Sequence, residues 1–347
     1  MRRLWTICLT MMLALAMAGP GMAAQRLIGA GATFPYPLYD KWFNIYHQQT
    51  GVKINYQAIG SGGGIRQLMN RIVDFGATDA FMSDKELSRA PAKILHIPTC
   101  LGAVVITYNL PGNPTLKLTP KVIADIFLGK IKKWNDPRLT RLNPSVVLPN
   151  MNIVVVHRSE GSGTTFIFSD FLTKVSRIWA KDVGRGKVLN WPTGLGAKGN
   201  PGVAGLIRQI PGSVGYVELI YAKENNMPIS LIKNKAGRFI APSLKSVSAA
   251  ANVKLPADTR VSITNTPAIN GYPISSFTWI IFYQEQDYQG RSENRAKTLA
   301  KLLWWMIHQG QRYNESLLYA KLPHNAVKCA EAVIRSMTYN GQKVVTW

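Results

Sequence analysis

From Leu27 onward the chain repeats one pattern, in which a short apolar run is followed by a turn of small residues and then by an amphipathic segment. The first unit passes from Leu27 through the turn at residues 29–34. It then enters a segment whose apolar residues recur at helical spacing, namely Leu38, Trp42, Ile45 and Tyr46. Strands that alternate with helices in this way are typical of α/β proteins. The pattern therefore predicts an α/β fold.

Two further units follow the same order. Residues 52–59 form the next predicted strand, and the glycine turn at 60–64 leads into a helix whose apolar face is Ile65, Leu68, Met69 and Ile72. A short strand at 74–78 runs directly into Asp79. Later, a strand at 152–156 and a turn at 161–163 lead into a helix that carries Phe166, Phe168 and Phe171. Residues 120–127, 298–308 and 325–337 are also predicted to be helical.

Two long apolar passages, 94–109 and 272–283, suit buried strands that pass between two halves of the molecule. We therefore predict that residues 24–100 and 273–347 form lobe 1 and that residues 101–272 form lobe 2. The two crossings, near Cys100 and Pro273, would make a hinge.

The first 23 residues have the features of an export signal. Arg2 and Arg3 precede an almost wholly apolar run at 4–18, and Gly19-Pro20-Gly21 then breaks any helix. Small residues suit cleavage after Ala23, which predicts an exported, secreted protein. A retained membrane anchor is the alternative, but a span needs roughly 20 apolar residues.

The chain is strongly basic, with 41 Lys and Arg against 18 Asp and Glu, a net charge of +23. Removal of the two signal arginines leaves 39 − 18 = +21. Such a field attracts anions. The basic residues are spread along the chain without an arginine-rich run or a nucleic-acid motif, so we expect no nucleic-acid partner. An adaptation to external conditions would explain the charge equally well.

Two cysteines remain after the signal, since Cys8 lies within it. Cys100 and Cys329 could pair in an oxidising compartment. Cysteines in apolar or helical surroundings are more often separate buried residues, and we favour that interpretation.

Three of the small-residue turns, at 31–34, 60–64 and 160–164, lie directly before a predicted helix. Small residues leave backbone N–H groups uncovered at a helix N-terminus, where the helix dipole also favours negative charge. The turns also supply hydroxyl groups, from Thr33, Ser61, Ser162 and Thr164. One such turn is common for steric reasons alone, but three in one chain predict an anion-binding site.

Arg158 closely follows the strand at 152–156, so its guanidinium should lie beside the third turn and bind oxyanion oxygens with a forked pair of hydrogen bonds. Glu160, two residues further on, is placed to hold that guanidinium. An ordinary surface ion pair is the alternative. The position of both residues within HRSEGSGT (157–164) favours the binding role.

Asp79 is unexpected near an anion site, because a carboxylate repels an anion unless the anion carries a proton. Hydrogen phosphate and dihydrogen phosphate have an O–H group to donate, whereas sulfate at neutral pH has none. An unpaired buried acceptor that faces a sulfate oxygen would cost several kcal/mol. Asp79 therefore favours phosphate over sulfate, molybdate or tungstate. A helix-capping role is the alternative.

Motifs for catalysis are missing where they would be needed. A hydrolase elbow around Ser162 requires glycine at position 160, which is Glu160. The histidines, at 47, 96, 157, 308 and 324, show no metal-binding spacing, and the glycine turns lack the nucleotide-binding endings. We expect neither an enzyme nor a bound metal or cofactor.

At this point the sequence resembles the periplasmic phosphate-binding proteins (PstS type) of bacterial phosphate ABC importers. The resemblance covers essentially the whole mature chain. It rests on GAGATFP (29–35), NYQ (55–57), IGS (59–61), DFGATDA (74–80), LGKIKKW (128–134), GSGT (161–164), GLG (194–196), KGN (198–200) and PGSVGYVE (211–218).

The resemblance implies a two-lobe periplasmic-binding-protein fold (Venus flytrap, type II) with a two-crossing hinge. Carried over by motif, the phosphate-binding residues would be Thr33, Phe34 through its N–H, Ser61, Asp79, Arg158, Ser162, Gly163 and Thr164, with Glu160 supporting Arg158. Two positions depart from the family pattern: Gly62 replaces a familiar serine, and Glu160 stands where aspartate is frequent.

The resemblance also implies the partners. These are inorganic phosphate and the permease subunits of an ABC transporter with their ATPase, so that a monomer would meet the membrane only through the transporter. An extracellular phosphate scavenger or adhesin without a transporter remains the alternative.

Overall fold

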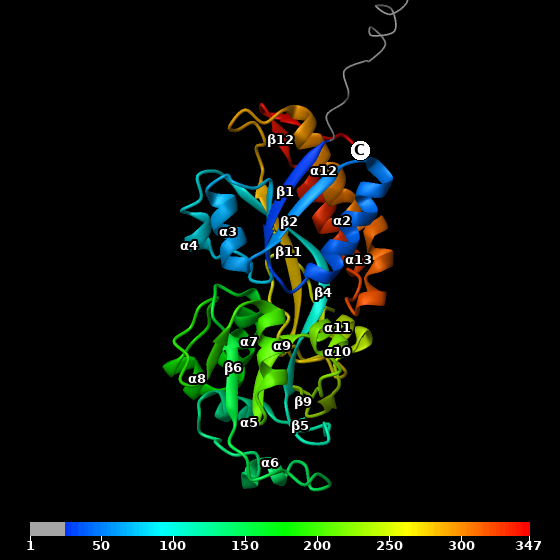
Figure 1. The fold of residues 1–347 in the computed structure, drawn as a ribbon. Coiled ribbons are helices and arrows are strands. Elements are labelled where there is room, and N and C mark those ends of the chain that lie inside the picture. Colours follow the sequence, from blue (N-terminus) through cyan, green and yellow to red (C-terminus); the bar gives the residue numbers. More distant parts are fainter. Residues whose placement is uncertain (1–24) are drawn as a thin grey trace, which may run out of the picture.

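The computed structural model describes residues 25–347 and shows two lobes stacked end to end (Figure 1). We call the upper one in Figure 1 lobe 1 and the lower one lobe 2. The predicted export signal, residues 1–23, lies outside the described residues.

Lobe 1 contains both ends of the described chain. Its elements are β1 (Arg26–Gly31), α2 (Tyr36–Thr50), β2 (Lys53–Ala58), α3 (Ser61–Met69), β3 (Phe75–Thr78), α4 (Asp84–Leu87), the start of β4 (Ile94–Tyr108), β11 (Ser275–Tyr283), α12 (Glu293–Ile307), the 3-10 helices η1 (Gln309–Tyr313) and η2 (Glu315–Leu317), α13 (His324–Arg335), β12 (Thr338–Tyr339) and β13 (Gln342–Lys343).

Lobe 2 is built from the middle of the chain. Its elements are the end of β4, β5 (Lys117–Leu118), α5 (Pro120–Phe127), α6 (Pro137–Thr140), β6 (Val154–Arg158), α7 (Gly163–Val175), α8 (Arg177–Asp182), β7 (Leu195–Ala197), α9 (Gly199–Gln209), β8 (Ser213–Glu218), α10 (Leu219–Glu224), β9 (Leu231–Lys233), β10 (Phe239–Ile240) and α11 (Leu244–Ala250).

One eight-stranded sheet runs through both lobes in the order β2-β1-β3-β11-β4-β8-β6-β7. Strand β4 belongs to both lobes: it pairs with β11 as far as Ala103 and with β8 from Val104 onward. Helices cover the sheet in each lobe (Figure 1). The predicted α/β, two-lobe fold is confirmed. The exact division of the chain at residues 100 and 273 stays a prediction.

The helix after the second glycine turn is shorter than predicted. Helix α3 ends at Met69, and Arg71 adopts a left-handed conformation with φ 58°. The amides of Arg71 and Ile72 then bond back to Leu68 O and Gln67 O, at 2.8 and 2.9 Å. This closure turns Ile72 outward, where 59% of it is exposed. The assignment of Ile72 to the apolar face was therefore wrong.

A β-bulge shapes the edge of the central strands next to the interface between the lobes. Thr278 of β11 pairs with Cys100 and Trp279 with Pro98, so Thr99 is the extra residue on β4. Thr99 Oγ1 lies 3.1 Å from the carbonyl oxygen of Thr278, to which it donates. Bulges of this kind re-aim side chains. Thr278 lies beside this bulge, and its own hydroxyl donates to Asp79 Oδ1 at 2.8 Å.

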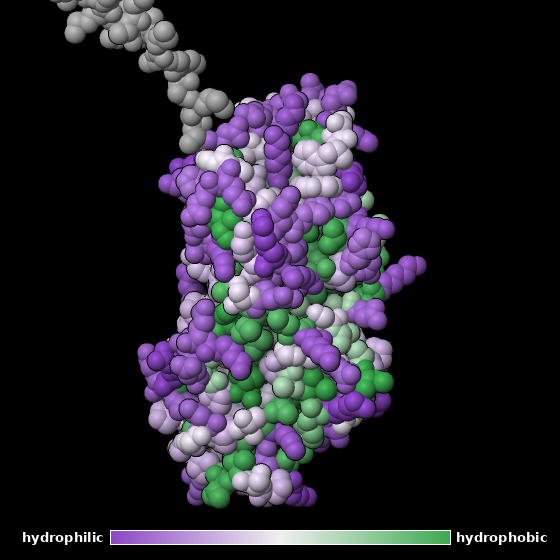
Figure 2. Space-filling model, turned by 90° about the vertical axis from the view of Figure 1, so that its right-hand side faces the viewer, coloured by the Kyte–Doolittle hydropathy of each residue, from purple (hydrophilic) through white to green (hydrophobic). Residues whose placement is uncertain are grey.

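Figure 2 shows hydrophilic residues over most of lobe 1, with more hydrophobic residues on the visible face of lobe 2. Among residues 25–347 no helix has the length and apolar character that a membrane crossing requires. Cys100 and Cys329 are both free thiols, Cys100 being buried and Cys329 partly buried. The pairing that the sequence left open is therefore not formed in this structure.

A buried ion cluster holds strand β3 in lobe 1. The carboxylate of Asp74, which is 0% exposed, accepts the amide of Ile28 at 2.6 Å. It also accepts Nε and Nη2 of Arg295 at 2.7 and 2.8 Å, and it contacts Arg291. Because β3 leads directly to Asp79, this cluster also fixes the position of that carboxyl group.

We predict that Asp74→Asn lowers the free energy of unfolding by about 3–5 kcal/mol, because it leaves a buried guanidinium without its counter-charge. Urea unfolding followed by circular dichroism measures the change. The exposed Asp287→Asn is the matched control and should change stability by less than about 0.5 kcal/mol. Equal stability of the two variants would contradict a role for the cluster.

Candidate functional site

The predicted anion-binding residues come together between the two lobes. Lobe 1 contributes the turn after β1, the N-terminus of α3 and Asp79 after β3, while lobe 2 contributes the segment from the end of β6 into α7. These segments all follow strands that run parallel within each half of the sheet, and the carboxyl ends of such strands share one edge. All the residues predicted to bind the anion are buried: Thr33, Phe34, Ser61, Asp79, Arg158, Ser162, Gly163 and Thr164.

Arg158, only 3% exposed, brings the positive charge of the site. Its Nε donates to Glu160 Oε1 at 2.9 Å, its Nη2 contacts the same oxygen, and its Nη1 donates to Thr164 Oγ1 at 3.0 Å. A guanidinium has five N–H bonds, so one on each terminal nitrogen remains unused. Those two suit a forked bond to an oxyanion. Glu160 makes the contact predicted for it, while its part in ligand binding stays a prediction.

The N-terminus of α7 supplies uncovered amides and a hydroxyl. Ser162 caps the helix by accepting the amide of Thr165 at 3.0 Å, which leaves the serine hydrogen available. The amides of Gly163 and Thr164 have no acceptor among residues 25–347. In lobe 1 the amide of Phe34 also has no acceptor in the described chain, while its carbonyl accepts Tyr319 Oη at 2.6 Å. The arrangement favours a small anion.

Asp79 stands among these donors with its carboxyl 2% exposed. Its Oδ1 accepts the hydroxyl of Thr278 at 2.8 Å, and its Oδ2 lies 3.5 Å from Ser61 Oγ. Burial raises the pKa of Asp79 from 3.8 to about 7, although the bonds from Thr278 and Ser61 and the charge of Arg158 lower it. Near neutral pH this carboxyl can therefore either accept or donate a proton.

The lobes touch one another at the site. The amide of Gly62 in lobe 1 donates to the carbonyl of Gly161 in lobe 2 at 2.8 Å. A Cβ atom on Gly163 would lie 2.4 Å from Ser61 Oγ and 2.6 Å from Asp79 Oδ2, so no larger residue fits there. Gly62 likewise faces backbone, since its Cβ would lie 3.1 Å from Gly161 Cα. The structure is therefore in a closed arrangement.

Several residues that hold the site were missing from the predicted set. They are Asn200, Tyr221, Thr278 and Tyr319, each of which bonds to a predicted ligand residue at least 36 positions away. The only sequence signal was the KGN motif at 198–200, to which no role was assigned. A hydrogen bond between distant segments leaves no local pattern in a sequence.

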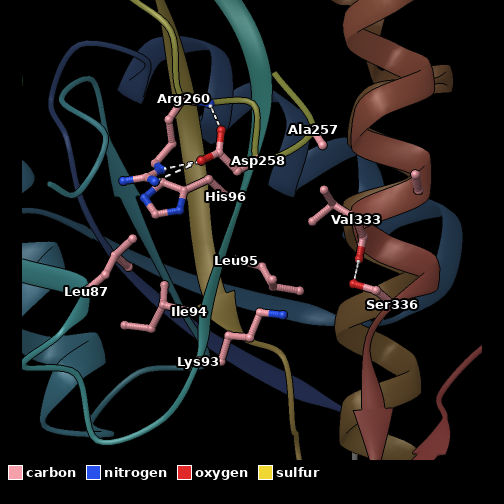
Figure 3. Close-up of a pocket in the computed structure, with 11 residues that line it drawn as sticks. Leu87, Lys93, Ile94, Leu95, His96, Ala257, Asp258, Arg260, Val333 and Ser336 are labelled. Carbon is pink, nitrogen blue, oxygen red and sulfur yellow. Dashed lines mark hydrogen bonds and ion pairs between the residues drawn. The ribbon is translucent and has the colours of Figure 1, made fainter. Parts of the chain in front are cut away.

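A cavity of about 510 Å³ lies elsewhere in the molecule (Figure 3). Leu87, Ile94, Leu95 and Val333 line it together with the charged residues Lys93, Asp258 and Arg260, of which the last two are paired. Burial lowers the pKa of His96 to about 3, so the ring is neutral and accepts the amide of Met82 at 3.1 Å. None of the predicted ligand residues lines this cavity. Among residues 25–347 no three His, Cys, Asp or Glu side chains are grouped to hold a metal ion.

Comparison with known proteins places the chain in a family. A family model of the PBP superfamily domain matches residues 18–309. A phosphate-binding protein PstS of Haemophilus influenzae is 42% identical over 89% of this chain and 92% of its own. Another, of Xylella fastidiosa, is 43% identical over 88% of this chain and 84% of its own. The chain belongs to the PstS family of phosphate-binding proteins.

The fold agrees with this membership. PfluDING, a high affinity periplasmic phosphate-binding protein solved with bound phosphate, superposes with a TM-score of 0.73 at 22% identity. The match covers 89% of this chain and 93% of that one. The family resemblance and the two-lobe periplasmic-binding-protein fold predicted from the sequence are confirmed. The individual ligand residues stay predictions on the PstS scaffold.

We predict that Asp79 makes the unliganded protein less stable as the pH rises. A carboxyl whose pKa is about 7 in the folded state and 3.8 when unfolded stabilises the fold fully below pH about 4. That contribution is lost as the pH rises through about 7. Between pH 5 and 8 the wild type should therefore lose about 2–3 kcal/mol of unfolding free energy relative to Asp79→Asn. Urea titrations of both proteins without added oxyanions test this, and parallel pH profiles would contradict it.

Proposed function

We propose that this chain binds inorganic phosphate outside the inner membrane and delivers it to the permease of a phosphate ABC transporter. The observation that carries the proposal is the buried carboxyl of Asp79, which lies against the N-terminus of α7 at Gly163 and within reach of the charge of Arg158. A site that combines many donors with one acceptor suits an oxyanion that carries a proton.

Phosphate meets both requirements of this site. Its unprotonated oxygens accept the two unused N–H bonds of Arg158, the amides of Phe34, Gly163 and Thr164, and the nearby hydroxyls. Its O–H donates to Asp79. Sulfate offers no hydrogen, so a sulfate oxygen would face the carboxylate across an unmade hydrogen bond.

Binding would be coupled to closure of the lobes. The donors lie on both lobes, so a phosphate ion contacts all of them only when Gly62 and Gly161 are in contact, as they are here. The hinge we propose lies where β4 changes partner, at Ala103 and Val104, and where the chain returns into β11 at Ser275. Closure is then driven by the greater affinity of phosphate for the closed state.

The same proposal covers location and partners. Residues 1–23 direct export to the periplasm, and the mature monomer presents its closed form to the permease subunits and their ATPase. No nucleic acid is involved.

The proposed role is binding without covalent chemistry. Ser162 Oγ is occupied as a helix cap. The ring of the neighbouring His157 stacks on Trp191 at 4.6 Å, and its Nδ1 lies 3.0 Å from the carbonyl oxygen of Arg158. His157 is therefore held away from the role of a general base for Ser162.

We predict that Arg158→Ala weakens phosphate binding by at least about 2 kcal/mol, roughly thirty-fold, because the forked, charge-assisted bonds disappear. Isothermal titration calorimetry measures the dissociation constant. Arg238→Ala removes the same charge from the exposed surface of lobe 2 and should leave affinity within about twofold. Equal losses of affinity in the two variants would contradict direct bonding, because Arg158 would then act only by attracting phosphate over a distance.

We predict that discrimination against sulfate depends on the protonation of Asp79. As the pH falls through about 7 the carboxyl gains a hydrogen that it can donate to a sulfate oxygen. Sulfate affinity of the wild type should therefore rise about tenfold or more between pH 8 and pH 5.

In Asp79→Asn the amide donates at every pH, so sulfate should bind at pH 8 and its affinity should vary little with pH. Competition between sulfate and phosphate, followed by calorimetry at both pH values, measures this. Continued exclusion of sulfate by Asp79→Asn would mean that another residue sets the discrimination.

A further inference from the structure

Asn200 lies at the meeting point of the two lobes. It is the second residue of α9, it is 0% exposed, and its backbone amide and side chain both reach across to the turn after β1. Its backbone N lies 3.2 Å from Thr33 Oγ1 and its Nδ2 lies 2.9 Å from the same oxygen. The Nδ2 also donates to Thr164 Oγ1 at 3.2 Å. One amide therefore contacts a predicted ligand hydroxyl of each lobe.

A hydrogen bond to the backbone of Glu218 fixes the orientation of this side-chain amide. Asn200 Oδ1 accepts the backbone N–H of Glu218 at 2.9 Å. A backbone N–H only donates, so the oxygen of the side chain must face Glu218 and the NH₂ group must face the threonines. Glu218 is the last residue of β8 and pairs with Val104, where β4 changes partner, so this support stands on the central sheet.

Two tyrosine side chains hold the backbone of the same turn in place. Tyr221 Oη donates to the carbonyl oxygen of Thr33 at 2.6 Å, and Tyr319 Oη donates to that of Phe34 at 2.6 Å. The turn is thus fixed at its carbonyls as well as at the threonine hydroxyl. Only the direction of the hydroxyl hydrogen remains to be set.

The hydrogen bonds that each threonine hydroxyl already accepts determine that direction. A hydroxyl has one hydrogen and accepts two hydrogen bonds. Thr33 Oγ1 accepts two, both from Asn200. Thr164 Oγ1 accepts one from Asn200 and one from Arg158 Nη1, at 3.2 and 3.0 Å. Neither hydroxyl donates to any residue within 25–347. Each is left with its hydrogen as its only unused group.

We propose that Asn200 is a positioning residue that turns the hydroxyls of Thr33 and Thr164 into obligatory donors toward the bound anion. The inference rests on the proposed phosphate binding and deepens it. It implies that the two oxygens facing these threonines must be unprotonated, so that the hydrogen of phosphate is directed to Asp79 alone. Thr33 belongs to lobe 1 and Asn200 to lobe 2. The direction of the Thr33 hydroxyl is therefore fixed only when the lobes close.

Two variants at this position test the proposal. Asn200→Ala removes the donors of the side chain. Asn200→Asp keeps its shape but offers only acceptors above the pKa of the new carboxyl, so both threonine hydroxyls would turn toward it and away from phosphate. Calorimetry at pH 8 should show that either variant weakens phosphate binding at least about tenfold. Asn225→Asp, which makes the same charge change at the end of α10 in lobe 2, should bind within about twofold of the wild type.

A double-mutant cycle separates positioning from simple packing. In a background that carries Thr33→Val and Thr164→Val there are no hydroxyls to orient, so Asn200→Ala should change the dissociation constant by less than about threefold. An equal loss in both backgrounds would overturn the proposal, because Asn200 would then act independently of the hydroxyls. Unchanged affinity of the single Asn200 variants would overturn it as well.

Two controls complete the design. The melting temperature of each phosphate-free variant reports folding, and if neither Asn200 variant folds, the residue is a structural element and the proposal is wrong. If the wild type itself fails to bind phosphate, the proposed function fails instead. In Asn200→Asp the loss relative to the wild type should also shrink as the pH falls, because a protonated carboxyl regains one donor.

Discussion

The guanidinium of Arg158 is the constraint around which the site is organised. Arg158 is only 3% exposed, and a buried charge requires hydrogen-bond partners and a counter-charge. Glu160 and Thr164 supply part of these. Its two remaining N–H bonds have no partner among residues 25–347, and we propose that a bound anion accepts them. The opposite sign of Asp79, on the other lobe, then limits which ligand can complete the set. We propose that affinity and selectivity reside in these two buried groups, each held by its own lobe.

Other residues hold Asp79 and the donor groups of the site in position. Asp74 fixes the strand that precedes Asp79, the hydroxyl of Thr278 donates to the carboxyl of Asp79, and Asn200 fills the acceptor positions of Thr33. The first two lie within lobe 1 and require neither the ligand nor closure, whereas the bonds from Asn200 to Thr33 form only when the lobes meet. Donors and acceptors that are oriented before binding lose less conformational freedom when the ligand arrives, which favours tight association. The site is thus prepared by the scaffold.

Much of this arrangement could be predicted from the sequence, because strands, glycine turns and helix starts are local. The turns at 31–34, 60–64 and 160–164, together with Arg158 and Asp79, were assigned to one site, and the structure brings them together. The end of α3 was missed because the left-handed turn at Arg71 has no glycine to mark it. Tyr221 and Tyr319 were missed because each meets the turn after β1 from a segment far along the chain.

The passage of β4 through both lobes has a mechanical consequence. Beside it the chain returns antiparallel, with Ser275 opposite Ala103 and the amide of Val104 bonded to Ile274 O at 2.9 Å. A pair of hydrogen-bonded antiparallel strands can bend and twist as a unit while its hydrogen bonds stay formed. Opening by such flexure would expose no unpaired backbone groups, so the elastic work of each cycle would be small.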